Sequence, residues 1–350
     1  MIDLKNKKLQ MNSTGDKILL SHGNGGRMMH QLIENLFLKN FENAVLDAQT
    51  DAAILPAGNG DIAFTTDSFV IDPIFFPGGN IGKLAVCGTV NDLAVSGADP
   101  LYLSVSFIIE EGFPMKELEL IVCSLAEEAR NARVSIVTGD TKVVNKGKCD
   151  KVFINTAGIG SVKQKNRNVS NGADIRPGDL ILINGTIGDH GMAVMIARES
   201  FNFKSPVISD CASLNHLIGE VLDQSTGVKF MRDPTRGGVA TVLNELAEKT
   251  GLGFEIDESA LPMTNGVTAM CELLGFEPLH IANEGKVLIV ADPGEVGLIL
   301  EIMKRNNLGT QSAVIGRVTA DHPGKVVLNT ETGGRRIVDT LTGDPLPRIC

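Results

Sequence analysis

A polar, turn-rich segment at residues 163–179, KQKNRNVSNGADIRPGD, divides this chain into two halves that repeat one pattern. In each half, apolar runs typical of strands alternate with glycine-containing loops and amphipathic helical runs. A chain of 350 residues is long enough to bury two cores. The pattern therefore predicts two α/β-type domains, at residues 21–165 and 175–340, between an N-terminal leader at 1–20 and a flexible tail at 341–350.

Local signals define several elements inside these halves. Residues 80–97 read as a helix that Gly97 closes. Residues 134–144, VSIVTGDTKVV, read as a strand that runs into a loop. The final segment, residues 325–341, reads as a hairpin around Gly333-Gly334.

Composition and charge exclude several classes of function. The net charge of −10 argues against a nucleic-acid backbone or an anionic membrane surface as the main partner. No apolar run reaches the roughly 18 residues of a membrane span, and the N-terminus lacks the apolar core of a signal peptide. The six cysteines form no CxxC pair, which disfavours a zinc site. We therefore expect a cytoplasmic protein with reduced thiols.

Five aspartates lie where ligand-binding carboxylates are expected. Asp67 and Asp140 fall at predicted strand–loop junctions, where ligands gather in α/β folds. Asp92 shares a helix face with apolar residues, where a charge is costly unless it meets a cation. Asp51 and Asp233 lie in the motifs QTDAAIL and RDPTRGG. Each acid alone is commonly a cap or turn residue, but the set fits Mg²⁺, which prefers oxygen ligands and often bridges carboxylates to nucleotide phosphates.

The chain contains neither a Walker loop nor a GxGxxG fingerprint after a strand. Its nearest substitute is HGNGGR, which contains Gly23, Gly25, Gly26 and Arg27. Successive backbone N–H groups of such a loop can form an anion-binding nest, to which the arginine adds charge. An ordinary glycine turn that caps a helix is the alternative interpretation.

The last six residues, PLPRIC, place Cys350 at the very end of the chain. The two prolines restrict the backbone and Gly343 provides a hinge before them, so the tail reads as a semi-rigid arm. Most terminal side chains have no function, and an inert thiol is the alternative that the tail alone favours.

These motifs together resemble the HypE family, the carbamoyl dehydratases of hydrogenase maturation. The resemblance rests on HGNGG, TTDSFVIDPIFFPGGNIGKLAVCGTVNDLAVSGADP, TGDTKVV, DPTRGG, ANEGK and the closing PRIC, and extends from Ser21 to Cys350. The acidic motifs are similar across a wider ATP-binding superfamily that includes aminoimidazole-ribotide synthetase, selenophosphate synthetase and thiamine-monophosphate kinase, whereas PRIC is specific to HypE. The resemblance implies a ferredoxin-like N-terminal domain that binds ATP and dimerises, an α/β C-terminal domain and a mobile tail.

The resemblance also implies a reaction at Cys350. A partner, HypF, would load a carbamoyl group onto its sulfur, and ATP would then drive dehydration of the S-carboxamide to a thiocyanate. The cyanide would pass to iron held by the HypC–HypD pair, for the active site of [NiFe]-hydrogenase. Such an arm must reach outward for loading and inward to meet ATP, so two positions of the tail are expected.

Residue roles follow from the same resemblance. It implies Mg²⁺ ligands at Asp51, Asp67, Asp92 and Asp233, and ATP-binding residues at Gly23, Gly25, Gly26, Arg27, Thr66, Asn91, Asp140 and Thr141. Besides Cys350, it implies catalytic roles for Lys142 and Glu284, either of which could take the proton. A plain surface ion pair is the alternative for these two. His190, in GDHGM, is interpreted as a turn residue and left out of the catalytic set.

Two other functions remain open on the sequence. The first is an ATP-dependent kinase or synthetase of the same superfamily that acts on a free small molecule and leaves the tail idle. The second is a scaffold whose tail docks a partner, against which the set of acids argues. A mass change on the C-terminal peptide that depends on ATP and a carbamoyl donor would distinguish the dehydratase from both.

Overall fold

The computed structural model describes residues 26–38, 49–57, 60–199, 207–341 and 348–350. The predicted leader, Gly23 and Gly25 lie outside these residues. A short helix, α1 (Arg27–Leu32), continues as one turn of π-helix over Ile33–Leu38. Among the described residues, no helix is both long and apolar enough to cross a membrane.

The first half of the described chain forms a five-stranded sheet in the order β1-β2-β7-β5-β6. Its strands are β1 (Ala53–Ala57), β2 (Gly60–Phe69), β5 (Ala98–Glu110), β6 (Ser135–Val144) and β7 (Val152–Val162). Neighbouring strands are antiparallel except for β5 and β6, which run parallel. A two-stranded ribbon, β3 (Phe75–Phe76) and β4 (Gly79–Asn80), joins β2 to the first long helix.

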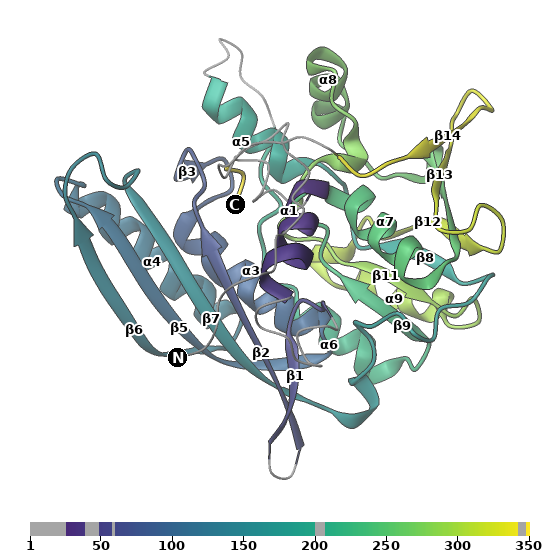
Figure 1. Ribbon diagram of the computed structural model, residues 1–350, viewed down its shortest axis with the longest axis horizontal. Helices are drawn as coiled ribbons and strands as arrows, with labels where there is room; N and C mark the ends of the chain where they lie inside the picture. Colours follow the sequence, from purple (N-terminus) through teal and green to yellow (C-terminus); the bar gives the residue numbers. More distant parts are fainter. Residues whose placement is uncertain (1–25, 39–48, 58–59, 200–206, 342–347) are drawn as a thin grey trace, which may run out of the picture.

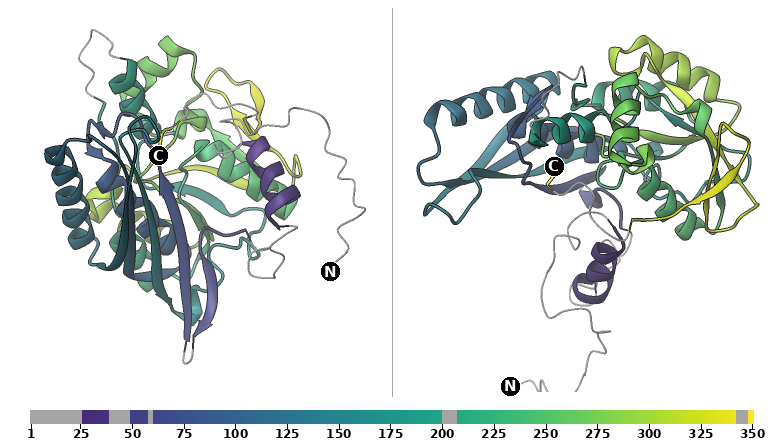
Figure 2. Two further views of the ribbon diagram at one scale, coloured as in Figure 1. Left: turned by 60° about the vertical axis from the view of Figure 1, so that its left-hand side comes forward. Right: turned by 90° about the horizontal axis from the view of Figure 1, so that it is seen from above.

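Two helices, α3 (Ile81–Val95) and α4 (Met115–Asn131), cover one face of this sheet (Figure 2). The Oδ1 of Asn80 caps α3 by accepting hydrogen bonds from the N–H groups of Gly82 and Lys83. The helix ends at the predicted glycine, since Gly97 has a φ of 84°. Nearly all of α3 is buried, because α4, the sheet and a helix of the second half, α6 (Asn215–Gln224), surround it.

The prediction for residues 134–144 is wrong in one respect. The strand does not run into a loop: β6 continues to Val144, and Asp140 lies in its middle rather than at a strand end. Parallel pairing with β5 along the whole segment, from Ser135 to Val144, accounts for the difference. The residues TGDT have weak strand preference on their own, and the neighbouring strand overrides it.

The second half forms a seven-stranded mixed sheet in the order β14-β13-β10-β12-β8-β11-β9. Its strands are β8 (Leu180–Ile183), β9 (Val228–Arg232), β10 (Gly253–Asp257), β11 (Leu288–Ala291), β12 (Ala313–Thr319), β13 (Val326–Asn329) and β14 (Arg335–Val338). β13 and β14 pair as an antiparallel hairpin, which confirms the prediction for residues 325–341.

Helices lie on both faces of the second sheet (Figure 1). They are α5 (Asp189–Glu199), α6 (Asn215–Gln224), α7 (Gly238–Thr250), α8 (Asn265–Leu274) and α9 (Val296–Arg305). α7 packs on one face with β8, β10 and β11, and α6 and α9 pack on the other. The two halves also share a core, because α5 contributes Met192 and Val194 to the cluster that contains α3 and α4.

Candidate active site

A cavity of about 510 Å³ lies between the two halves of the chain. Its walls come from the segment before β1, from β2, from α3, from the loop between β9 and α7, and from the loop before β11. The last residue of the chain, Cys350, also lines it. Residues far apart in the sequence therefore meet in one concave site, which is the usual form of a small-molecule site.

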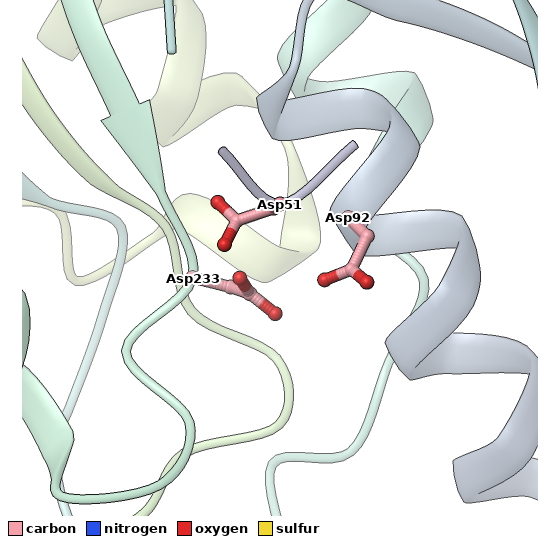
Figure 3. Close-up of side chains that lie close together, drawn as sticks. All are labelled: Asp51, Asp92 and Asp233. Atoms are coloured by element: carbon pink, nitrogen blue, oxygen red, sulfur yellow. The ribbon is translucent and has the colours of Figure 1, made fainter. Parts of the chain in front are cut away.

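Three carboxylates that line this cavity lie close together, as Figure 3 shows. Asp51, Asp92 and Asp233 each place one oxygen within 4.8 Å of the others. They come from three elements: the segment before β1, the middle of α3 and the end of β9. The fold of the chain, rather than a local sequence pattern, brings these three residues together.

The electrostatics of this trio favour a cation. Burial, followed by repulsion from Asp67 and Asp233, raises the pKa of Asp92 well above its usual value. Burial and then repulsion from Asp51 raise the pKa of Asp233 to about 8. Carboxylate oxygens are the ligands that Mg²⁺ prefers, and a bound divalent cation would offset this repulsion. The donor set therefore fits a divalent metal ion.

Asp67, the fourth predicted ligand, lies beside the trio. Its side chain is hydrogen-bonded to that of Asp92, and burial is the main cause that raises its pKa. The Thr65 hydroxyl lies 2.9 Å from Asp92 Oδ2 and 2.8 Å from the main-chain oxygen of Asp51, so it links two of the acids. Thr66, predicted to bind the nucleotide, lines the same cavity, and its hydroxyl donates to the Thr156 carbonyl.

An arginine that the sequence analysis missed fixes Asp51. Arg232 directs its Nε at both oxygens of Asp51, 3.0 Å from each, and its Nη1 at Glu245 Oε2, 2.6 Å away. His30 of α1 reaches the other oxygen of Glu245 at 3.0 Å. The sequence did offer a sign of this arginine, because Arg232 directly precedes Asp233 in the motif MRDPTRGG.

The end of the tail lies in the inward of its two expected positions. The N–H of Val70 donates to the Cys350 carbonyl over 3.1 Å, and Ile349 is buried in the core that α3 and α4 share. Arg236, a second arginine that the sequence analysis missed, lines the cavity with Cys350. The negative charge of Cys350 is the first cause that raises the pKa of Arg236.

Glu284, in the loop before β11, lines the same cavity as Cys350. Its Oε1 is buried and has no hydrogen-bond partner among the described residues. Burial is the main cause that raises the pKa of Glu284 well above its usual value, and the electrostatic interaction with the nearby Cys211 is the second. The main chain around it is fixed, since its N–H donates to Asp210 Oδ1 at 3.1 Å and its carbonyl accepts from Asn91 Nδ2 at 3.2 Å.

Two groups of predicted site residues lie outside the cavity lining. Asp140, Thr141 and Lys142 lie on β6, where Lys142 Nζ and Asp140 Oδ2 form a largely exposed ion pair at 2.9 Å. Within a single chain, Lys142 therefore forms a surface ion pair, which is the alternative to a catalytic role that the sequence left open. It pairs with Asp140, not with Glu284, which lies in the cavity.

Asn91 and the described part of the glycine loop also lie away from the cavity lining. Asn91 is buried, and its amide bonds the carbonyls of Ala212 and Glu284 and the N–H of Leu214, so it joins the two halves. Arg27 donates its N–H to the Leu341 carbonyl, and neither it nor Gly26 lines the cavity.

Two family models match successive parts of the chain. The model described as AIR synthase related protein, N-terminal domain, matches residues 49–162. The model of the C-terminal domain of the same proteins matches residues 176–329.

Curated relatives are similar over nearly the whole length. The carbamoyl dehydratase HypE of Rhizobium leguminosarum bv. viciae is 49% identical over 99% of this chain and 99% of its own. The carbamoyl dehydratase HypE of Escherichia coli (strain K12) is 48% identical over 96% of this chain and 100% of its own.

Solved structures agree with these relatives. A chain of a HypE–HypF complex has a TM-score of 0.84 and 49% identity, covering 89% of this chain and 99% of that chain. HypE in complex with ATP has a TM-score of 0.80 and 45% identity, covering 95% and 100%. The thiamine monophosphate kinase of Aquifex aeolicus, at 19% identity and a TM-score of 0.66, covers 89% and 99% and shares the fold alone. The predicted two-domain fold class is thereby confirmed.

Proposed function

Because the chain belongs to the HypE family of carbamoyl dehydratases, we propose that it uses ATP to dehydrate a carboxamide on the sulfur of its own Cys350. The product is a thiocyanate at the end of the chain, which supplies the cyanide ligand of a [NiFe]-hydrogenase iron. One observation carries the proposal: Cys350 lies in the same cavity as Asp51, Asp92, Asp233 and Glu284.

The reaction proceeds in two steps. The carboxamide oxygen attacks the γ-phosphorus of ATP, the bond to ADP breaks, and the oxygen carries the phosphoryl group. The carbon–oxygen bond then breaks, phosphate leaves, and loss of the nitrogen protons closes the C≡N bond. The sum is carboxamide and ATP to thiocyanate, ADP and phosphate, with no change of oxidation state.

ATP and Mg²⁺ would occupy the cavity next to the acidic trio. A solved relative binds ATP, which supports a nucleotide site here. Asp51, Asp92 and Asp233, with Asp67 beside them, would hold Mg²⁺, which supplies neutralisation of phosphate charge and orientation of the γ-phosphoryl group. Thr66 would contact the nucleotide from β2. Gly23, Gly25, Gly26 and Arg27 would cover the phosphates as a loop, which stays a prediction.

Glu284 is the proposed base for the nitrogen protons. Its unpaired Oε1 is available to accept a proton, and a carboxylate with a raised pKa is a stronger base once ionised. Arg236 lies near Glu284 and near Cys350, so its positive charge favours the ionised carboxylate and stabilises negative charge at the reacting group.

A second copy of the chain supplies the residues on β6. The face of the five-stranded sheet opposite α3 and α4 exposes apolar side chains, namely Phe64, Tyr102, Ile108 and Ile159. Asp140 and Lys142 pair with Ser106 and Ile108 of β5, and laterally paired residues share a sheet face. A homodimer through this face would bury the apolar patch and direct Asp140 and Lys142 toward the cavity of the other copy. Thr141 pairs with Phe107 and lies on the other face of β6, so its nucleotide-binding role stays a prediction.

The proposed partners follow the path of the cyanide group. A relative forms a complex with HypF, which supports HypF as the carbamoyl donor to Cys350. The HypC–HypD pair would accept the cyanide. Both exchanges need the sulfur outside the cavity, so the inward position seen here is the one that suits dehydration.

The test is mass spectrometry of the C-terminal peptide of the full chain. With HypF, its carbamoyl source, ATP and Mg²⁺, we expect Cys350 to gain a carbamoyl group and then to lose one water. Cys350→Ala should show neither change and still bind ATP, whereas Cys123→Ala, at an exposed position on α4, should behave as wild type. An unmodified wild-type peptide under these conditions would refute the proposal.

A further inference from the structure

The contacts of the last three residues show how the tail is positioned. We propose that α5 and the Val70–Asp72 segment form a dock that holds the tail inward through its main chain, with His190 and Arg198 as its positioning residues. This inference rests on the function proposed above, and it explains how the sulfur is brought repeatedly to one place.

Each of the last three carbonyls meets a fixed donor. The Arg348 carbonyl accepts from the N–H of Asp72 at 3.2 Å, and the Cys350 carbonyl accepts from the N–H of Val70 at 3.1 Å. The Ile349 carbonyl accepts from His190 Nε2 at 2.7 Å. Because every donor addresses the backbone, the register of the tail is fixed whatever group the Cys350 sulfur carries.

The contacts around His190 fix the orientation of its ring toward the tail. Its ring is fully buried, and the edge of one ring meets the face of the other between His190 and Phe76, with centroids 5.3 Å apart. The N–H of Cys211 donates to Ser209 Oγ, so the Ser209 hydroxyl can donate to His190 Nδ1 at 2.8 Å. That arrangement leaves the proton on Nε2, directed at the tail. Burial lowers the pKa of His190, which keeps the ring neutral.

Arg198 ties the tail to the first half of the chain. Its Nη2 donates to the Arg348 carbonyl at 3.0 Å, and Nε and Nη2 donate to the Asp72 carbonyl at 2.9 and 2.7 Å. His190 and Arg198 both lie on α5, so one helix of the second domain grips the tail against a segment that follows β2.

The tail contributes two side chains of its own. Arg348 donates from Nε to the Val70 carbonyl at 3.0 Å and pairs with Asp150. Its φ of 55° is uncommon for a residue with a Cβ, and these contacts hold it there. Ile349 is buried, which anchors the middle of the segment.

The dock acts at one stage of the cycle only. Dehydration needs the tail inside, whereas loading by the donor needs it outside. Weakening the dock should therefore slow dehydration without slowing loading, whereas loss of a residue needed only for folding would lower both rates.

The experiment compares His190→Leu, His190→Gln, Arg198→Met and wild type in the full chain, with Arg305→Met as a matched control at an exposed site on α9. Alkylation of Cys350 is followed on the C-terminal peptide, without donor or ATP. Loading by HypF, and single-turnover dehydration of preloaded protein at saturating ATP and Mg²⁺, are then measured, together with the melting temperature. Gln retains an N–H donor near the position of Nε2, so it should restore the wild-type values.

We expect His190→Leu and Arg198→Met to raise alkylation about 10-fold and to slow dehydration about 10-fold, because each loses a hydrogen bond to a carbonyl of the tail. Loading should be unchanged or faster. Equal alkylation rates in all variants, or loading and dehydration that fall together, would overturn the proposal. The alkylation measurement uses no cosubstrate, so it remains decisive if wild type makes no thiocyanate and the proposed function itself fails.

Discussion

Arg232 lies with its Nε 3.0 Å from both oxygens of Asp51. This contact orients one member of the acidic trio and supplies a positive charge behind it. A side chain that hydrogen-bonds to a metal ligand usually affects metal affinity nearly as much as the ligand itself does.

We predict that Arg232→Met weakens Mg²⁺ binding about 10- to 100-fold, the usual effect of removing a group that orients a ligand. Titration of the apo protein with Mg²⁺, followed by the melting temperature, measures it. Arg305→Met, which removes an exposed arginine far from the cavity, should titrate as wild type. Equal Mg²⁺ affinity in the Arg232 and Arg305 variants would contradict the role given to this contact.

The pH dependence of Mg²⁺ binding follows from the raised carboxyl pKa values. Asp233, with a pKa of about 8 in the folded protein and a lower one when unfolded, binds more protons when folded. Its contribution to stability therefore falls as pH rises from about 4 to 8 in the absence of metal. Mg²⁺ must displace that proton, so we predict that the stabilisation by Mg²⁺ increases from pH 6 to pH 8.5. An increment that is constant across this range would contradict the prediction.

Replacing the proposed base should separate chemistry from binding. Glu284→Gln keeps the shape of the side chain but cannot take a proton, so single-turnover dehydration should fall about 10²- to 10⁴-fold. ATP binding should be unchanged. The melting temperature at pH 8 should hold or rise, because the variant no longer buries a carboxyl whose raised pKa costs stability above its unfolded value. Dehydration at the wild-type rate would exclude Glu284 as the base.

The position of Lys142 on the exposed sheet face leads to a complementation test. Lys142→Ala and Cys350→Ala should each be inactive alone. If Lys142 serves the cavity of the other copy, mixed dimers contain one site with both an intact sulfur and an intact lysine. We therefore expect mixing the two variants to restore up to about a quarter of the wild-type yield of thiocyanate for random exchange of subunits. No recovery in verified mixed dimers would show that Lys142 does not act across the interface.

The parts of the structure that local chemistry determines were predictable. The helix at residues 80–97 has an asparagine cap and a closing glycine within its own sequence, and the hairpin at 325–341 has its own turn. The β6 strand was not predictable from TGDT, because pairing with β5 decides its length. The candidate ligands Asp51, Asp92 and Asp233 were selected by setting and by family resemblance, and their role as Mg²⁺ ligands stays a prediction.

Contacts between distant residues were the part that the sequence could not supply. His190 reads as a turn residue because its partner, the Ile349 carbonyl, lies 159 positions away. Arg232 reaches Asp51 across 181 positions. Nothing within a few residues of either side chain reports such a partner, since the approach depends on how the two domains and the tail pack.

Cys350 lies in a cavity made by its own chain, so the reacting group does not have to be captured from solution. Its conversion should be first order, with a rate constant that does not change with protein concentration as long as the association state of the chain stays the same. An ordinary KM then applies to ATP alone, and a molecule that has made its thiocyanate is stalled until that group has been handed on. The transfer of cyanide to the acceptor therefore limits turnover, and each encounter with the acceptor releases one cyanide.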